Sequence, residues 1–233
     1  MGLGLGILAL YFFVRFNETQ VAGMLAGLAP KLELSVPAEL QGLPWIDQMP
    51  RAPLSWWIPG VESHFERLLC RRFPMVGGIF WRNHFSSRLI RIELQAREPL
   101  VRWQGSGLDA GGVLFPLTAP LKEKGPVLEC APGDHPNPAL MLWLNTLHQQ
   151  TWLWPQIAAF HEDGRGHWYL ELHSGILVAW GPPTVKAVAV KSAALSQLME
   201  SQRMSGPVTA DLRFFEDGRI IWSKAMRTSP WRN

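Results

Sequence analysis

Hydrophobic and polar residues alternate most regularly between Leu89 and Ala96. From Ile90 onward, each apolar residue is followed by a charged or amide residue. In a β-strand, this alternation puts the apolar side chains on one face and the polar side chains on the other. We therefore predict a strand of an antiparallel or mixed sheet that helices cover on one side only.

Helical spacing and capping residues predict four helices. Apolar residues recur every three or four positions in 61–72, and Pro74 ends that helix. Asn137 followed by Pro138 marks the start of another helix, because Asn is a good cap and Pro is tolerated in the first turn. The expected helices cover a short segment at 37–46, then 61–72, a segment from Asn137, and 184–202 with Thr184 as its cap.

Strand and turn signals fill most of the remaining chain. Strands are expected at 31–36, 75–82, 89–96, 100–103, 157–160, 168–172 and 176–180, and strand pairs at 108–117 and 208–224. Turns are expected at 83–87, Gly111–Gly112, Asp163–Gly164, Ser174–Gly175 and Asp217–Gly218. The chain is thus predicted to be α+β and rich in strands.

The segment Gly105-Ser106-Gly107 is the best candidate for a domain boundary. Before it, the elements at 31–103 form a small α+β module. After it, strand signals dominate a second domain at 107–227, which holds two helices, and a tail follows at 228–233. The chain length of 233 residues fits two small domains.

The first residues of the chain carry no charge until Arg15. The thirteen residues Gly2 to Val14 would span about 20 Å as a helix, whereas a bilayer core is about 30 Å thick. We expect a short, uncleaved membrane anchor at 1–16 and a linker at 17–30. We also hypothesise that the natural reading frame starts upstream, with a short basic tail. An upstream in-frame start codon without basic or apolar residues after it would contradict this hypothesis.

Two alternatives to an anchor stay open. One is a signal peptide cleaved near Ala22 or Ala26, although no basic residue precedes the apolar segment. The other is a buried N-terminal helix. The anchor and the signal peptide both place the rest of the chain outside the cytoplasm.

Composition limits the function classes. The chain is 47% hydrophobic and 18% charged, which is typical of a folded protein. A net charge of +3, without a run of basic residues, does not favour nucleic acid as a partner. Cys70 and Cys130 fit no metal or redox spacing, so the simplest interpretation is two small buried residues. A disulfide between them would require an oxidising compartment and close Cα atoms.

No motif for catalysis or for a cofactor is present. The segment HEDGRGH at 161–167 has the wrong spacing for two metal ligands on one helical face and contains a hairpin signal. There is no G-x-S-x-G sequence, and LDAGG at 108–112 lacks the pattern of a phosphate-binding loop. We therefore predict a protein that is not an enzyme and that needs no metal, cofactor or small-molecule substrate.

Four segments, in a fixed order, follow the pattern of a known family. They are FPMVGGIFWRNHFSSRLIRIELQAREPLVRW, GLDAGGVLF, GHWYLELHSGILVAWG and ADLRFFEDGRIIW. The matching positions include Pro74, Val76, Arg97, Glu98, Pro99, Trp103, Asp109, Gly112, Phe115, Trp168, Gly175, Gly181, Asp211, Leu212, Arg213, Phe214, Gly218 and Trp222. From about Leu32 to Trp222 the chain resembles the FtsQ/DivIB family of bacterial cell-division proteins.

This resemblance implies an architecture. It implies one membrane helix, a POTRA domain (β-α-α-β-β) at 31–103, and a C-terminal β domain at 107–227 with a curved, mostly antiparallel sheet and two helices. The chain departs from the family in three respects. It lacks a cytoplasmic tail, it has Phe214-Phe215 where the family has a single aromatic residue, and it matches poorly at 37–60.

The resemblance also implies a role. It implies a non-catalytic, single-pass protein of the cell inner membrane at the division septum, with its domains in the extracytoplasmic space. There it would dock bitopic coiled-coil proteins of the FtsB/FtsL class during septum formation. The POTRA domain is a second candidate for recruitment contacts, through Arg82 or the strand at 89–96.

The terminal strand pair is the expected docking site. A strand at the end of a sheet presents open N–H and C=O groups, to which a partner can add a strand. Apolar residues there would anchor the partner, and arginines would pair with its acidic residues at the rim. The expected partner-binding residues are Arg213, Phe214, Phe215, Arg219, Ile221 and Trp222. Asp211 is expected to fix the hairpin locally through Arg213.

Three alternatives remain open at this stage. The apolar residues of the hairpin could simply be core, because alternation buries one set of each strand. The chain could be a secreted or envelope assembly factor of the POTRA type, which would predict tandem modules or a large barrel. It could also be a periplasmic hydrolase with scattered catalytic residues, which would predict a deep polar cleft.

Overall fold

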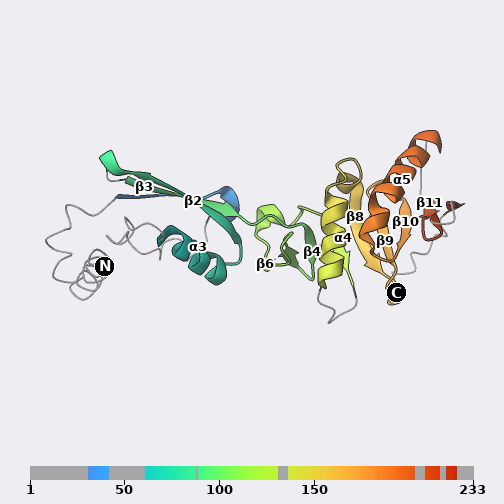
Figure 1. The fold of residues 1–233 in the computed structure, drawn as a ribbon, viewed down its shortest axis with the longest axis horizontal. Helices are drawn as coiled ribbons and strands as arrows, with labels where there is room; N and C mark the ends of the chain where they lie inside the picture. The colour runs from blue at the N-terminus through green and yellow to red at the C-terminus, as the bar shows by residue number, and fades with distance from the viewer. Residues whose placement is uncertain are drawn as a thin grey trace, which may run out of the picture. The chain divides into compact units, whose positions relative to one another are not determined.

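The computed structural model describes residues 31–41, 61–87, 89–130, 136–202, 208–215 and 219–224. The chain divides into two compact units, one ending at Ala96 and the other beginning at Arg97 (Figure 1). The predicted anchor at 1–16, the linker, the Asp217–Gly218 turn and the tail lie outside the described residues. Within the described part, no helix combines the length and the apolar character needed to cross a membrane.

The first unit holds a three-stranded sheet and a helix. Its strands are β1 (Lys31–Ser35), β2 (Val76–His84) and β3 (Leu89–Ala96), in the order β1-β3-β2. β1 is parallel to β3, and β2 is antiparallel to it. The helix α3 (Val61–Arg72) has the predicted bounds, and the ring of its Phe65 packs edge-on against Trp81 of β2.

The alternation in β3 is confirmed, since Ile90, Ile92 and Leu94 are all buried. Two other expectations for this unit need correction. Only a 3-10 turn, η1 (Ala38–Leu40), forms in the described part of the expected helix at 37–46. The expected turn at 83–87 begins later, because β2 continues through His84 before η3 (Phe85–Ser87).

The extension of β2 has a local cause in Asn83. Its side chain accepts a hydrogen bond from Trp81 Nε1 at 2.7 Å and donates one to Glu62 at 3.2 Å. Asn often favours turns because its side chain bonds to nearby backbone. Here the side chain bonds to other side chains instead, so the backbone stays in the strand.

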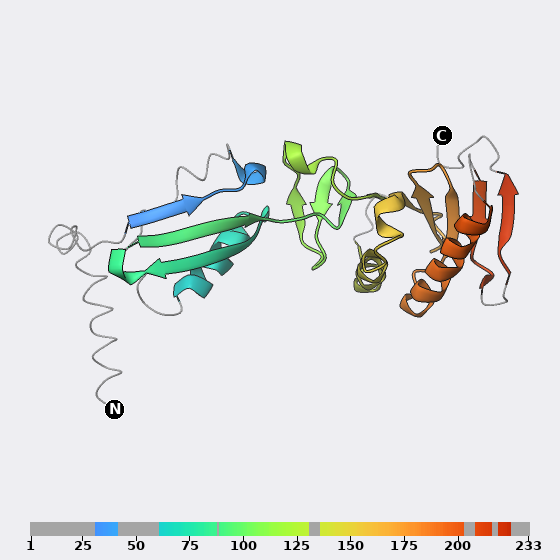
Figure 2. The same ribbon diagram turned by 90° about the horizontal axis from the view of Figure 1, so that it is seen from above.

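The second unit is built on a nine-stranded sheet. Its strands are β4 (Val101–Trp103), β5 (Ser106–Leu108), β6 (Leu114–Pro116), β7 (Val127–Glu129), β8 (Ile157–Glu162), β9 (Trp168–Leu172), β10 (Leu177–Gly181), β11 (Val208–Asp211) and β12 (Ile221–Lys224). Their order is β12-β11-β10-β9-β8-β7-β4-β5-β6 (Figure 2). Five of the eight pairings are antiparallel and three are parallel, so the sheet is mostly antiparallel.

β4 lies in this second sheet, although its residues were grouped with the first module. It pairs with β5 and β7, and the segment Gly105–Gly107 forms part of the β4–β5 hairpin. Gln104 and Gly105 both have positive φ, 48° and 79°, as a tight hairpin turn requires. The glycines therefore mark a hairpin rather than a linker, and the structure divides the chain after Ala96.

Two helices cover the core of this sheet. α4 (Pro138–His148) begins as predicted, with Asn137 Oδ1 accepting from Leu140 N at 2.8 Å. α5 (Val188–Gln202) begins later than predicted. The Thr184 side chain caps nothing; its N–H donates to Pro182 O, and a 3-10 turn, η6 (Val185–Ala187), precedes the helix.

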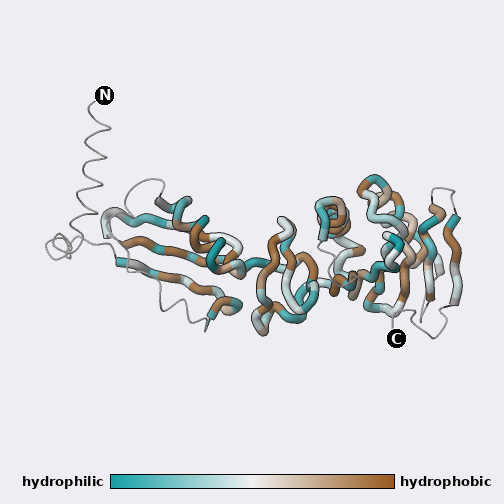
Figure 3. The backbone as a smooth tube through the Cα atoms, turned by 90° about the horizontal axis from the view of Figure 1, so that it is seen from below, coloured by the Kyte–Doolittle hydropathy of each residue, from teal (hydrophilic) through white to brown (hydrophobic). Residues whose placement is uncertain are grey.

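One row of buried side chains crosses the middle of the sheet. Leu128, Phe160, Leu170, Val178 and Ala210 are cross-strand neighbours on five successive strands, and all are buried. Figure 3 colours the backbone by hydropathy, and both hydrophobic and hydrophilic residues occur along the sheet. The meander β8-β9-β10 is confirmed, with its turns at the predicted places.

Trp143 of α4 fills the centre of the core. Its side chain is completely buried, and its ring centroid lies 5.7 Å from Phe160, 5.8 Å from Trp168 and 6.2 Å from Trp180. Aromatic rings at these separations attract one another beyond the burial of their surface. This cluster ties α4 to the middle of the sheet.

Candidate docking edge

The two outer strands of the large sheet differ. β6, at one end, has three residues and includes Pro116, which cannot donate a backbone hydrogen bond to a further strand. β12, at the other end, contains no proline, and β11 is its one neighbour among the described strands. β12 is therefore the edge of this sheet that is suited to accept an added strand.

The predicted hairpin forms this edge. β11 and β12 pair antiparallel, with Asp211 opposite Ile221 and Val208 opposite Lys224. β11 in turn pairs parallel to β10, and the ladder continues with a bond from Leu212 N to Ala179 O at 2.9 Å. The edge strand is thus held to the rest of the unit through β11.

The apolar residues of the hairpin divide into two sets. Phe214 and Ile221 are about half exposed, at 48% and 51%. Leu212 is fully buried, and Phe215 and Ile220 pack partly buried against the core. The buried set belongs to the core, and partner binding by the exposed set stays a prediction.

The remaining predicted residues lie as follows. Arg219 is exposed and precedes β12. The backbone of Trp222 lies opposite Ala210, and its side chain is outside the described part of the structure. Phe214 and Phe215 belong to the turn after β11 rather than to the strand predicted to reach residue 214.

Asp211 and Arg213 form a close fork at the start of this turn. Arg213 donates from Nε and Nη2 to the Asp211 carboxylate at 2.6–3.1 Å, and its backbone N donates to the same carboxylate at 3.0 Å. Its guanidinium also lies 5.8 Å from the centre of the Phe214 ring. The Asp211–Arg213 pair therefore orients the exposed Phe214 side chain, consistent with the local role expected of Asp211.

The Asp211–Arg213 pair shifts the pKa of the Asp211 carboxyl group. Burial tends to raise the pKa of Asp211, but hydrogen bonds from Arg213 and the charges of Arg213 and Lys191 outweigh it. The net effect lowers the pKa of Asp211 below its usual value of 3.8. The carboxylate is consequently ionised at neutral pH, and Arg213 is already paired before any partner arrives.

The predicted structural positions lie elsewhere and build the scaffold. Pro74 follows α3, and Val76 is buried at the start of β2. Arg97 Nη1 donates to Asp109 Oδ2, and the other Asp109 oxygen accepts from Gly111 N at 2.9 Å and Val113 N at 2.7 Å.

The turn at Asp109 leads into β6. Gly112, with φ of 80°, allows the chain to reverse there. Pro99 lies between Arg97 and the first residues of β4. None of these residues contributes to the β12 edge.

One polar cluster was missed by the sequence analysis. His161 of β8 is buried, with Nδ1 2.9 Å from Glu129 of β7 and Nε2 3.1 Å from Glu171 of β9. Since Phe160 faces the core, His161 lies on the opposite face of the sheet. A strand histidine gives no local signal of such neighbours, because they depend on the register of three strands.

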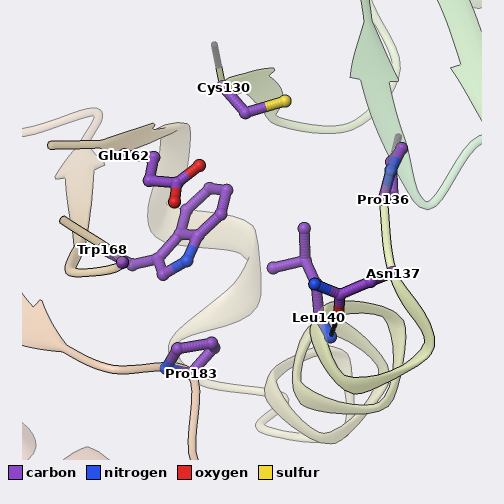
Figure 4. Close-up of a pocket in the computed structure, with 8 residues that line it drawn as sticks. Cys130, Pro136, Asn137, Leu140, Glu162, Trp168 and Pro183 are labelled. Atoms are coloured by element: carbon purple, nitrogen blue, oxygen red, sulfur yellow. Dashed lines mark hydrogen bonds between the residues drawn. The ribbon is translucent and has the colours of Figure 1, made fainter. Parts of the chain in front are cut away.

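A pocket of about 290 Å³ lies beside the N-terminus of α4. Figure 4 shows the Trp168 ring and Leu140 on opposite sides of it, with Glu162 and Cys130 nearby. Cys130 Sγ accepts a hydrogen bond from Trp103 Nε1 at 3.0 Å, and no disulfide joins Cys70 and Cys130. Across the described residues, no group of three His, Cys, Asp or Glu side chains is arranged to hold a metal ion.

Comparison with family models identifies a match for the second unit. The family model described as "Cell division protein FtsQ/DivIB, C-terminal" matches residues 101–213, which run from β4 to the turn after β11. A search of curated proteins finds no significant match. The match covers eight of the nine strands of the large sheet.

Proposed function

Because the chain belongs to the FtsQ/DivIB family of cell division proteins, we propose that it is a scaffold of the bacterial divisome. In this proposal it has no catalytic activity of its own. It is held at the septum in the inner membrane by an N-terminal helix, and its POTRA and β domains lie outside the cytoplasm. It docks bitopic coiled-coil proteins of the FtsB/FtsL class during septum formation.

The observation that carries the proposal is the edge at β12, which has no second strand beside it among the described residues. A partner strand beside β12 would gain main-chain hydrogen bonds, and side chains next to Ile221 would fix its register. Ile221 and Phe214 together offer exposed apolar contacts at this edge. A few such anchors supply most of the binding energy in a protein interface.

The rim of the edge is polar. Arg219 is exposed and adds a cation at the start of β12, whereas the charge of Arg213 is neutralised by Asp211. Acidic residues of a partner would therefore meet Arg219 more favourably than Arg213. In this proposal Arg219, rather than Arg213, pairs with the acidic residues of the partner.

The test compares two charge substitutions in the full-length protein. Ile221→Glu places a carboxylate on the edge, and Leu142→Glu places one on α4, where the side chain is similarly exposed, at 58% against 51% for Ile221. Both proteins are extracted from native cell membranes with mild detergent. Partners are quantified by mass spectrometry, and folding is checked by circular dichroism.

We expect wild type and Leu142→Glu to recover small bitopic coiled-coil proteins. Ile221→Glu should recover them at least tenfold less, which corresponds to a loss of about 1.4 kcal/mol or more. Equal recovery by both variants would exclude the β12 edge as the docking site. Recovery of no such protein by wild type would overturn the scaffold proposal itself.

A further inference from the structure

A lysine is buried beside the docking hairpin. Lys191, in the first turn of α5, is only 4% exposed. Burying an ammonium group is costly unless hydrogen bonds and opposite charges offset the lost hydration. The contacts of Lys191 should therefore reveal why this position carries a charge.

Its ammonium group contacts the end of β10. Nζ donates to the carbonyl oxygen of Trp180 at 2.6 Å and lies 5.6 Å from the centre of the Trp180 ring. At this place β10 shifts its register against β9, between Ala179 and Gly181. An irregularity in a ladder frees backbone groups from regular pairing, and a lysine donor satisfies such a carbonyl.

The same charge acts on β11. Lys191 is one of the groups whose attraction stabilises the ionised Asp211. Asp211 is the last residue of β11, where it lies opposite Ala179 on one side and Ile221 on the other. By its bond to Trp180 O the lysine joins α5 to the end of β10, next to Ala179, which pairs with Asp211 at the end of β11.

The connection lies at the point where the hairpin leaves the sheet. The parallel pairing of β10 with β11 includes three residue pairs and ends at Ala179–Asp211. Beyond it, the Arg213 side chain packs over Gly181, whose φ is 91°. The orientation of β12 depends on how firmly this short junction is fixed.

We propose that Lys191 is a positioning residue for the docking edge: from α5 it fixes the end of β11, and thereby holds β12 in the orientation that a partner recognises. This inference rests on the proposed docking function, but its structural part does not require a partner. Lys191 itself touches no partner in this scheme, because it lies within the core.

The first test uses hydrogen exchange of the full-length protein. Lys191→Met keeps the length of the side chain and removes the charge, whereas Lys186→Met removes an exposed lysine from η6 as a matched control. We expect amides of 208–215 and 219–224 to exchange about tenfold faster in Lys191→Met, with less than twofold change in α4 and β8. Lys186→Met should match wild type throughout.

A second readout separates positioning from general packing. Removing the cation removes one of the causes that lower the pKa of Asp211, so that pKa should rise in Lys191→Met and stay unchanged in Lys186→Met. It can be followed by NMR of the side-chain carboxylate. If Lys191→Met does not fold, Lys191→Gln, which removes the charge but retains a donor for Trp180 O, replaces it in the pKa measurement, where an unchanged pKa of Asp211 would overturn the positioning role.

The outcomes distinguish the two proposals. Unchanged exchange in the hairpin, or faster exchange spread over the whole unit, would overturn the positioning role. Faster exchange in the hairpin together with a tenfold loss of co-purified partners supports both proposals. Faster exchange with undiminished partner recovery would support the positioning role and overturn docking at β12.

Discussion

The Arg97–Asp109 pair offers the sharpest test of how the second unit is held together. Both side chains are about 15% exposed, and the Asp109 carboxylate also accepts the N–H groups of Gly111 and Val113. Asp109→Ala removes all three bonds at once. Asp109→Asn keeps an oxygen for the two backbone donors but loses the charge that faces Arg97.

The magnitudes follow from these contacts. Removing one partner costs about 3–5 kcal/mol in a fully buried ion pair and about 0–1 kcal/mol in an exposed one, so we assign about 1.5 kcal/mol to this pair, which retains some access to water. The two backbone donors contribute about 1 kcal/mol each. We therefore expect about 3 kcal/mol for Asp109→Ala and about half of that for Asp109→Asn.

The assay is urea unfolding followed by near-UV circular dichroism, which reports on the packing around Trp143. With a denaturant slope of about 2 kcal/mol per molar, the midpoint should fall by about 1.5 M for Asp109→Ala. Asp163→Ala is the control, because the Asp163 side chain is also about 15% exposed and accepts from Arg165 N and His167 N, but its charged neighbour is His167 rather than an arginine. Its midpoint should fall by about 1 M, because two backbone hydrogen bonds of about 1 kcal/mol each are lost. Equal shifts for the two variants would refute the importance of the ion pair.

Three further predictions concern the same unit. Trp143→Ala should cost about 3–5 kcal/mol, measured by the same unfolding experiment, because it leaves a large cavity among three aromatic rings. Gly125→Ala should lower the free energy of unfolding more than Gly164→Ala does. Both glycines have positive φ, but a Cβ at Gly125 would lie 3.0 Å from a backbone oxygen, whereas a Cβ at Gly164 would meet open space. The pKa of Asp211 is about 3.9 in the unfolded chain and lower in the folded protein, so the ionised carboxylate contributes its full stabilisation above about pH 3.9. This stabilisation should be lost as the pH falls from there through the folded-state pKa. Asp211→Asn should flatten that part of a stability–pH profile.

Local patterns were sufficient for most elements. α3 and β3 follow from apolar spacing, and α4 from its Asn137-Pro138 start, because each depends on neighbours within one turn or strand. The antiparallel hairpin of β11 and β12 was predicted from alternation on both sides of a turn signal. These features are encoded within about twenty residues, where periodicity is informative.

Features that depend on distant pairing were not predictable. β7 has three residues, too few for a period, and it gains its place from β4 on one side and β8 on the other. β4 could not be assigned to a sheet before its partners were known. The position of Lys191 within the core depends likewise on how α5 returns over β10.

The candidate site was predictable in location but not in detail. Alternation predicted which segment ends the sheet, but not that Phe215 packs on the core while Phe214 is exposed. The missing information is the turn conformation after Asp211, where the strand ends three residues earlier than expected. A residue-by-residue list of contacts was therefore beyond the sequence alone.

The parallel pairing of β10 with β11 also has a consequence for the order of assembly. Parallel neighbours need a crossover, and here α5 and its flanking segments separate Gly181 from Val208. β12 then adds to β11, so each of its sheet neighbours is synthesised before it. During synthesis the β12 edge is completed only after the chain beneath it has been made, and an incomplete chain that lacks residues 219–224 would have β11, rather than β12, as the outer strand at this end of the sheet.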